Sequence, residues 1–219
     1  MTRLQIRDLI RKKLGETTAA FWTDTELNTW INDAGHDIAF KTKCQRTNGT
    51  FTTVEGTAEY TATSQFSTLI SIFEVYYYQD GSSWEKLTPT TRTELDHLHP
   101  GWLSAANGTP YQYYFDREED VIRLYVPPDS TNAGTDYCKV FYAYDYVDVT
   151  GDSTESPLPA RLHDAQVDYV TALGFEQRGH GDKANDAWQK YYTKLKIYMG
   201  ERSREKEDEE IVSKNYRNI

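Results

Sequence analysis

The stretch FWTDTELNTWINDAGHDIA, residues 21–39, carries a specific signal for the start of an amphipathic helix. Thr23 is placed as an N-cap, and Glu26, three residues later, completes a capping box. Trp22 precedes the cap and can pack on Leu27 as a hydrophobic staple. Because apolar residues then recur at helical spacing, we predict a helix that continues to about residue 44. The apolar positions are Leu27, Trp30, Ile31, Ala34 and Ile38.

Another helix is predicted before this stretch, over residues 3–14. Apolar residues lie on one of its faces, and Gly15 is placed to end it. Basic residues are interleaved with them, so we expect an amphipathic helix with a solvated basic face; contact of that face with nucleic acid is the alternative. The apolar residues are Ile6, Leu9, Ile10 and Leu14, and the basic ones are Arg3, Arg7, Arg11, Lys12 and Lys13.

Two more amphipathic helices are predicted towards the other end of the chain. The sequence SPLP at 156–159 places proline near a first turn, and the helix that follows runs to Gly179. Asp182 is placed to cap the last helix. Their apolar stripes are Leu162, Ala165, Tyr169, Ala172 and Leu173, and then Ala184, Ala187, Trp188, Tyr191, Leu195, Tyr198 and Met199. Neither terminal pair of helices can bury its stripe alone, so we expect the two pairs to form one four-helix bundle.

The middle of the chain has a different pattern, with short Thr-rich and Tyr-rich segments of alternating polarity. Strands are predicted at about 51–54, 58–62, 69–79, 84–88, 111–115, 121–126 and 136–146. Asn48-Gly49 is expected to form a turn, and a short helix is expected over 91–97. Short strands joined by tight turns predict an antiparallel sheet or a small barrel.

The predicted fold class is therefore α+β, with a β-rich region inserted into a helical bundle. We expect the bundle to comprise residues 1–48 and 152–202, the inserted β-rich domain to comprise 49–151, and a C-terminal tail to comprise 203–219.

A run of five charged residues, 116–120, is the place where paired catalytic carboxylates would be sought. The segments on both sides alternate in polarity like strands, and no His, Ser or Cys accompanies the charges. We therefore interpret the run as the tip of a hairpin. Its residues are Asp116, Arg117, Glu118, Glu119 and Asp120.

The composition favours a protein that contacts partner proteins over an enzyme. The net charge of −10 argues against a protein that grips DNA through phosphate neutralisation. The 17 Tyr and 5 Trp suit wet protein interfaces, because their rings bury a large area and keep a polar edge. The two cysteines, Cys44 and Cys138, lack a metal-type spacing and are expected to be reduced thiols of a cytoplasmic product. No segment has the length of apolar sequence that a membrane span requires.

Metal and catalytic motifs are weak or absent in the sequence. His97 and His99 form the only close histidine pair, and a metal site would need three or four ligands. We therefore expect no enzyme activity, and no catalytic, cofactor-binding or metal-binding residues.

The last residues, 201–219, combine a mixed-charge run with a short apolar end. A frayed helix end is one interpretation. The other is a tail that becomes ordered on a partner, with Ile211, Val212 and Tyr216 as its anchors.

The order of these motifs resembles the head-to-tail adaptor (connector) proteins of tailed bacteriophages, particularly short-tailed phages. The resemblance covers roughly residues 3–200 and rests on order and spacing rather than on one signature. The residues that carry it are FWTDTEL at 21–27, Trp30-Ile31-Asn32, Asp37-Ile38-Ala39, Gly108-Thr109-Pro110 with Tyr113, IRLY at 122–125, Pro127-Pro128-Asp129, Leu158-Pro159, and GDKA at 181–184.

This resemblance implies a structural role in the neck of a virion. Family members form a ring below the portal, usually dodecameric, which extends the DNA channel and docks the next tail or nozzle protein. Their C-terminal segment commonly reaches the portal, a role that would fall here to residues 201–219. DNA would pass through the acidic ring without sequence-specific binding.

Two other functions fit parts of the sequence. One is a β-rich glycan-binding module of a tail or capsid, whose candidate platform is Tyr76, Tyr77, Tyr78, Trp84 and Trp102. The other is a hydrolase that uses the carboxylates of the run 116–120.

Overall fold

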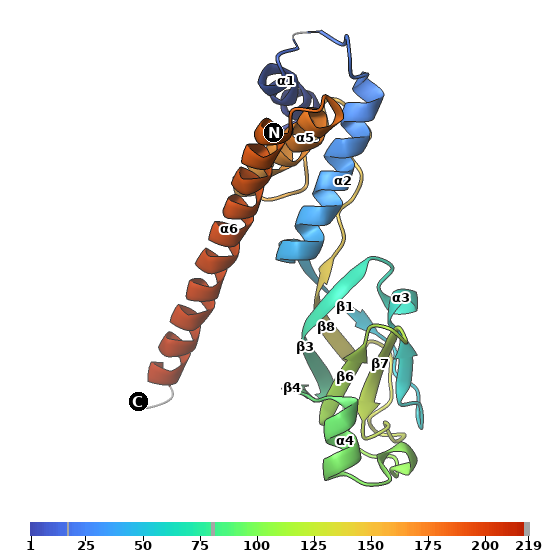
Figure 1. Ribbon diagram of the computed structural model, residues 1–219. Coiled ribbons are helices and arrows are strands. Elements are labelled where there is room, and N and C mark those ends of the chain that lie inside the picture. Colours follow the sequence, from blue (N-terminus) through green and yellow to red (C-terminus); the bar gives the residue numbers. More distant parts are fainter. Residues whose placement is uncertain (17, 80–81, 217–219) are drawn as a thin grey trace. The chain divides into compact units, whose positions relative to one another are not determined.

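The computed structural model describes residues 1–16, 18–79 and 82–216, with side chains as far as Arg204. The chain divides into two compact units (Figure 1). The helical unit combines Met1–Gln45 with Tyr146–Ile219, and the β unit is Arg46–Asp145.

In the helical unit, helices from both ends of the chain pack together (Figure 1). Its elements are α1 (Arg3–Leu14), α2 (Asp24–Thr42), the 3₁₀ turn η2 (Ala160–Leu162), α5 (His163–Gln177) and α6 (Gly181–Tyr216). Helix α5 contacts each of α1, α2 and α6. The core shared by α1, the start of α2 and α5 is formed by Ile6, Ile10, Leu14, Trp22, Leu27, Ile31, Ala34, Val167 and Val170. The prediction that the two ends of the chain share one helical core is confirmed.

The helix ends follow local capping chemistry. The capping box of Thr23 and Glu26 is present as predicted, and Thr2 with Gln5 forms a second box at the start of α1. Gly15 ends α1 with φ 75°, a left-handed conformation that glycine adopts without steric cost. Helix α2 ends at Thr42, slightly before the predicted residue 44, because Lys43 is itself left-handed.

One glycine of α2 permits a close approach within the helical unit. A Cβ on Gly35 would lie 2.5 Å from ring atoms of Tyr146, a residue that is almost fully buried. The hydroxyl of Tyr146 lies 3.4 Å from Nε2 of Gln166, so the ring is fixed on α5 as well. Gly35 therefore sets how closely α2 and the segment after the β unit can pack.

The β unit contains two four-stranded sheets that face each other across a core. The first has the order β1 (Arg46–Phe51), β8 (Cys138–Tyr144), β3 (Leu69–Gln79), β4 (Ser83–Lys86). The second has the order β2 (Glu59–Thr61), β7 (Val121–Tyr125), β6 (Gln112–Asp116), β5 (Thr88–Pro89). Two short helices and a 3₁₀ turn lie in the connections between strands: α3 (Ala62–Gln65) between β2 and β3, and α4 (Arg92–Leu98) and η1 (Trp102–Ser104) between β5 and β6. The core includes Phe51, Tyr60, Phe66, Val75, Tyr77, Leu87, Tyr113, Ile122, Leu124 and Val140.

The small-barrel alternative was wrong, and so was a wholly antiparallel arrangement. In the described part of the chain, the strands form two separate sheets, and the chain passes from one sheet to the other at several points, among them Leu87. Leu87 is buried in the core between the sheets, so β4 ends in one sheet and β5 begins in the other. Strand β5 then pairs parallel to β6. Parallel neighbours need a long connection, and α4 lies in the connection between these two strands.

Two local features of the β unit, a turn and a strand, also differ from the sequence expectation. The expected turn at Asn48-Gly49 lies inside β1, where a Cβ on Gly49 would lie 2.7 Å from the ring of Phe66. Strand β1 escaped prediction because it is an exposed, polar edge strand without alternation of apolar residues. The predicted helix over 91–97 is confirmed as α4, which begins with a capping box of Thr91 and Glu94.

A buried histidine, His163, joins the start of α5 to the N-terminus. Its Nε2 lies 2.9 Å from the carbonyl oxygen of Leu158, and its Nδ1 lies 2.9 Å from the amino group of Met1. The neutral ring satisfies both partners, with Nε2 donating and Nδ1 accepting. Burial first, and the Met1 ammonium second, lower the pKa of His163 below its ordinary value of 6.5.

We predict that replacement of Gly35 by Ala destabilises the helical unit. The new methyl group would meet a buried ring, so overpacking should cost about 1–3 kcal/mol despite the better helix propensity of Ala. The matched control is Gly200→Ala in α6, where a Cβ meets no atom within 4 Å and the change should stabilise by up to about 1 kcal/mol. Denaturant unfolding of both variants measures the difference. Equal effects of the two substitutions would refute the close approach.

We also predict that protonation of His163 destabilises the protein. Because the folded-state pKa is lowered, the stabilising contribution of the neutral ring is present above pH 6.5 and is lost as pH falls below it. The melting temperature of the untagged wild type should fall by about 2–4 °C per pH unit more than that of His163→Gln below this point. If the melting temperatures of the two proteins fell equally between pH 7.5 and 5, a neutral, buried His163 would be contradicted.

Candidate assembly surfaces

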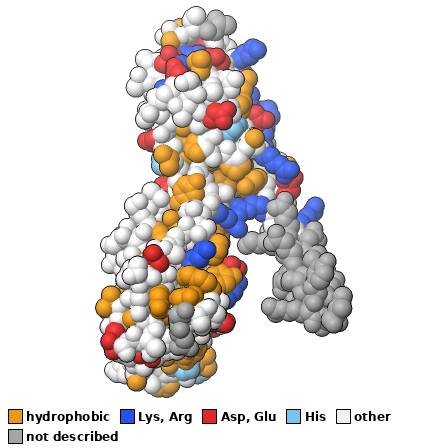
Figure 2. All heavy atoms as spheres, turned by 180° about the vertical axis from the view of Figure 1, so that it is seen from behind, with side chains coloured by type: hydrophobic (Ala, Val, Ile, Leu, Met, Phe, Trp, Pro, Cys, Tyr) orange, Lys and Arg blue, Asp and Glu red, His pale blue; other side chains and the backbone are white. Residues whose placement is uncertain are grey.

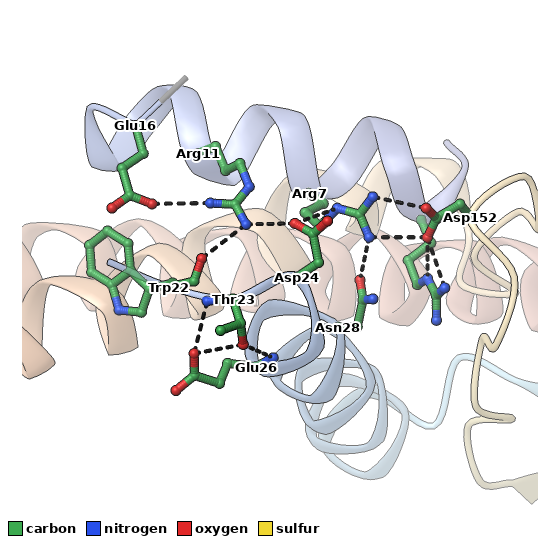
Figure 3. A network of polar contacts seen from close by, with 10 residues as sticks. Arg7, Arg11, Glu16, Trp22, Thr23, Asp24, Glu26, Asn28 and Asp152 are labelled. Atoms are coloured by element: carbon green, nitrogen blue, oxygen red, sulfur yellow. Dashed lines mark hydrogen bonds and ion pairs between the residues drawn. The ribbon is translucent and has the colours of Figure 1, made fainter. Parts of the chain in front are cut away.

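The densest polar cluster of the helical unit is a network around two buried arginines of α1 (Figure 3). Arg11 donates from Nη1 to Oε2 of Glu16 at 3.0 Å, and from Nη2 to Oδ1 of Asp24 at 2.6 Å. The same Nη2 donates to the backbone carbonyl of Trp22 at 3.1 Å. Arg11 thus ties α1 to the segment that caps α2.

Arg7 continues the network towards the segment that returns from the β unit (Figure 3). Its Nη2 lies 2.9 Å from Oδ2 of Asp152, and its Nη1 donates to Oδ1 of Asn28 at 3.1 Å. Arg3 adds a second ion pair to Asp152 at 2.8 Å. Hydrogen bonds from Arg7 and Arg3 lower the pKa of Asp152, and the bond to Asp152 raises the pKa of Arg7.

This network corrects the expectation of a solvated basic face on α1. Arg7 and Arg11 are buried, and each is ion-paired to a carboxylate. Lys13 likewise lies 2.6 Å from the buried carboxylate of Asp168 on α5. These charges join the parts of the helical unit to one another, so they are not available as a patch for nucleic acid.

The charged run 116–120 is the turn between β6 and β7, as predicted. Oδ1 of Asp116 accepts hydrogen bonds from the backbone nitrogens of Glu118 and Glu119, at 2.9 and 3.0 Å. The carboxylate of Asp120 accepts from the backbone nitrogen of Thr63 at 3.2 Å and from its hydroxyl, which holds the start of α3. Both aspartates therefore have local structural roles.

One face of the first sheet bears a set of aromatic and basic side chains, which we call the aromatic–lysine face. It consists of Tyr76 and Tyr78 on β3, Trp84 and Lys86 on β4, and Lys139 and Phe141 on β8. Tyr78 and Trp84 are cross-strand partners with ring centroids 5.2 Å apart, and the centroids of Tyr76 and Phe141 are 5.7 Å apart. Figure 2 shows hydrophobic and basic side chains together on the body that contains the strands.

The lysines of this face are placed by its strand register. Lys86 and Lys139 both pair with Tyr76, one from each neighbouring strand. Lys86 lies 2.6 Å from Glu74, and this hydrogen bond raises the pKa of Lys86. Nζ of Lys139 lies 5.4 Å from the centroid of Phe141. The face is therefore apolar at its centre, with Lys139 and the Lys86–Glu74 ion pair beside it.

The five aromatic residues considered as a glycan platform do not lie together. Tyr76, Tyr78 and Trp84 share the aromatic–lysine face, but Tyr77 points into the core between the sheets. Trp102 is buried against the other sheet, under α4. Phe141, Lys86 and Lys139 of this face were not among the residues expected from the sequence. The alternation of side chains along their strands was the signal that could have placed them on one face.

The opposite side of the β unit is covered by α4, η1 and the β6–β7 turn, and we call it the α4 face. Leu95 and Trp102 pack there against Tyr114 and Tyr125, residues whose neighbours in the strands face the core between the sheets. The carboxylates of this side include Glu94, Asp96, Glu118 and Glu119, and its exposed apolar side chains include Leu98 (62% exposed) and Leu103 (63% exposed). Between α4 and the turn lies a hollow of about 340 Å³, lined by residues that include Arg92, Tyr114 and Glu118.

The histidines His97 and His99 lie at the end of α4. The ring of His99 packs on Tyr125 with centroids 4.9 Å apart. Within residues 1–16, 18–79 and 82–204, no three His, Cys, Asp or Glu side chains are grouped to hold a metal ion.

Helix α6 exposes three large apolar side chains and continues beyond the end of α2. They are Tyr192, Ile197 and Met199. Arg202 donates to the backbone carbonyls of Thr42 and Lys43, each at 3.1 Å, and so caps the C-terminal end of α2. The predicted anchors Ile211, Val212 and Tyr216 lie on the part of α6 after this point, and their side chains are outside the described residues. Among the helices described, none has an apolar segment long enough to cross a membrane.

We predict that Arg11→Met destabilises the helical unit by about 3 kcal/mol, because it removes one partner of a buried ion pair. The control is Arg161→Met on the exposed pair with Glu201, which should cost less than about 1 kcal/mol. Urea unfolding of both variants tests the difference. A small, equal loss of stability in both variants would mean that the network around α1 contributes little to the stability of the helical unit.

Comparison with known proteins identifies the family but no individual relative. No curated protein matches the chain. The family model described as SU10 adaptor protein matches residues 1–213, which include the helices of both ends and the whole β unit. The chain therefore belongs to the SU10 adaptor protein family, a family of phage head–tail adaptors.

Proposed function

We propose that this protein forms a ring, a dodecamer in the virion, directly below the portal protein of a bacteriophage. The ring would extend the DNA channel and provide the docking surface for the next tail or nozzle protein. The observation that carries this proposal is the family match over residues 1–213. A structural adaptor of this kind needs no catalytic centre and would be located in the neck of the virion.

The long helix α6 supports contact with the portal. It has 36 residues and continues past Arg202, which caps the end of α2. We assign the portal contact to the tail 203–219, with Ile211, Val212 and Tyr216 as anchors. The bundle segments 1–48 and 152–202 would form the body of the ring, and the inserted domain 49–151 would contribute further subunit or tail contacts.

The charge of the protein supports a DNA channel. With a net charge of −10, a ring of twelve copies repels the phosphate backbone, so DNA stays mobile during packaging and ejection. The basic residues of α1 do not oppose this, because Arg3, Arg7 and Arg11 are each paired with a carboxylate.

Electron microscopy of the protein mixed with its portal tests the proposal, with the full chain compared to a chain that ends at Arg202. The full chain should give ring-shaped complexes on the portal. The shortened chain should keep its melting temperature within about 2 °C, because the helices' shared core lies before residue 203, but bind the portal at least about tenfold more weakly. A full chain that forms no ring and no portal complex would overturn the proposal.

Glycan binding is the second candidate, since Tyr76, Tyr78 and Trp84 share one exposed face. A glycan array probed with the wild type and with Trp84→Ala separates the two functions. A signal that is lost in the variant, together with a lack of portal binding, would favour the glycan-binding module.

A further inference from the structure

We propose that the β units of neighbouring copies contact each other head to tail: the aromatic–lysine face of one copy docks on the α4 face of the next. This inference rests on the proposed ring, and it names the surfaces through which the β units of that ring would meet. The occupant of each face is thus a second copy of this chain.

The two faces lie on opposite sides of the β unit. Between the sheets, Val75, Tyr77 and Val140 of the first sheet meet Tyr113 and Leu124 of the second. Side chains alternate along each strand, so the strand neighbours of these residues point outward on both sides. Tyr76 and Lys139 point away from the core on one side, and Tyr114 and Tyr125 on the other. An element with two different, opposed faces is the geometry that a head-to-tail contact requires.

The two faces carry complementary charge. Among the described residues around the aromatic–lysine face, three cations, Arg46, Lys86 and Lys139, accompany two carboxylates, Glu74 and Asp136. Asp136 accepts a hydrogen bond from Thr50, the strand partner of Lys139. The α4 face presents the carboxylates of Glu59, Glu94, Asp96, Asp116, Glu118 and Glu119 against the cations of Arg92, Arg117 and Arg123, so carboxylates predominate there. Complementary potentials across an interface fix the orientation of the partners and exclude wrong pairings.

Both faces also present apolar area for burial. Trp84 is 43% exposed beside Tyr78, and Leu98 and Leu103 are each more than 60% exposed on the other side. The hollow of about 340 Å³ beside Glu118 provides a concave surface on the α4 face. An aromatic centre with a charged rim is the usual composition of a specific protein interface.

Charge reversal on either face tests the contact. Lys86→Glu with Lys139→Glu places two acidic faces against each other, and Glu118→Lys with Glu119→Lys places two basic faces against each other. We expect each double variant alone to require at least about tenfold more protein than the wild type for half-maximal ring formation on the portal.

A mixture of the two double variants gives the sharper result. The acidic version of the aromatic–lysine face in one variant is complementary to the basic α4 face of the other, and the remaining two faces keep their natural charges. The mixture should therefore restore rings in which the variants alternate. Native mass spectrometry of the complexes should show equal numbers of the two variants.

The control is Lys12→Glu with Lys183→Glu, at two exposed lysines of the helical unit. These substitutions change the net charge by the same amount as the lysine reversal on the β unit. This control should form rings like the wild type, and all variants should melt within about 3 °C of it. Rings formed normally by both β-unit variants, or an equal loss in the control, would overturn the head-to-tail contact while leaving the proposed ring intact. A wild type that forms no ring would instead overturn the proposed function.

Discussion

The structure of the helical unit depends on the burial of α5 between helices from the two ends of the chain. Gln166 of α5 is fully buried and donates from Nε2 to the carbonyl of Ile31 in α2 at 2.8 Å. Asp168, also buried, accepts hydrogen bonds from Lys13 of α1 and Lys194 of α6. Removing the N-terminal helices would leave Gln166 without the Ile31 carbonyl, take Lys13 from Asp168 and expose the apolar stripe of α5. The ends must therefore fold as one body, and the β unit can only be an insertion within it.

The insertion begins and ends on paired strands, which makes it compatible with the helical unit. Arg46, the first residue of β1, lies opposite Ala143 near the end of β8. The two connections thus leave the β unit side by side, so the inserted sheets add little constraint to the helical core. After this exit, Asp152 binds Arg3 and Arg7 and anchors the returning segment on α1. The same pairing explains why basic residues are interleaved with the apolar stripe of α1.

The sequence predicted the features that depend on local chemistry and missed those that depend on distant partners. The Thr23–Glu26 capping box, the end of α1 at Gly15 and the β6–β7 turn all follow from neighbouring residues. The buried roles of Arg7 and Arg11 depend on Asp24 and Asp152, which no periodicity within α1 reveals. The sheet switch at Leu87 was missed for the same reason, since its cause is a core contact across the two sheets. The aromatic–lysine face was found only in part, because Lys139 and Phe141 join it through strand pairing.

The segregation of charge between the two sides of the β unit bears on the symmetry of the proposed assembly. In a two-fold symmetric dimer, identical faces meet, so Lys86 and Lys139 would oppose their own copies, or Glu118 and Glu119 would oppose theirs. Like charges placed across an interface cost free energy, which disfavours both of these symmetric contacts. Only unlike faces can meet without this cost, and a contact between unlike faces is repeated by every copy until the assembly closes. The charge pattern thus acts against two-fold symmetric pairs and favours the proposed ring.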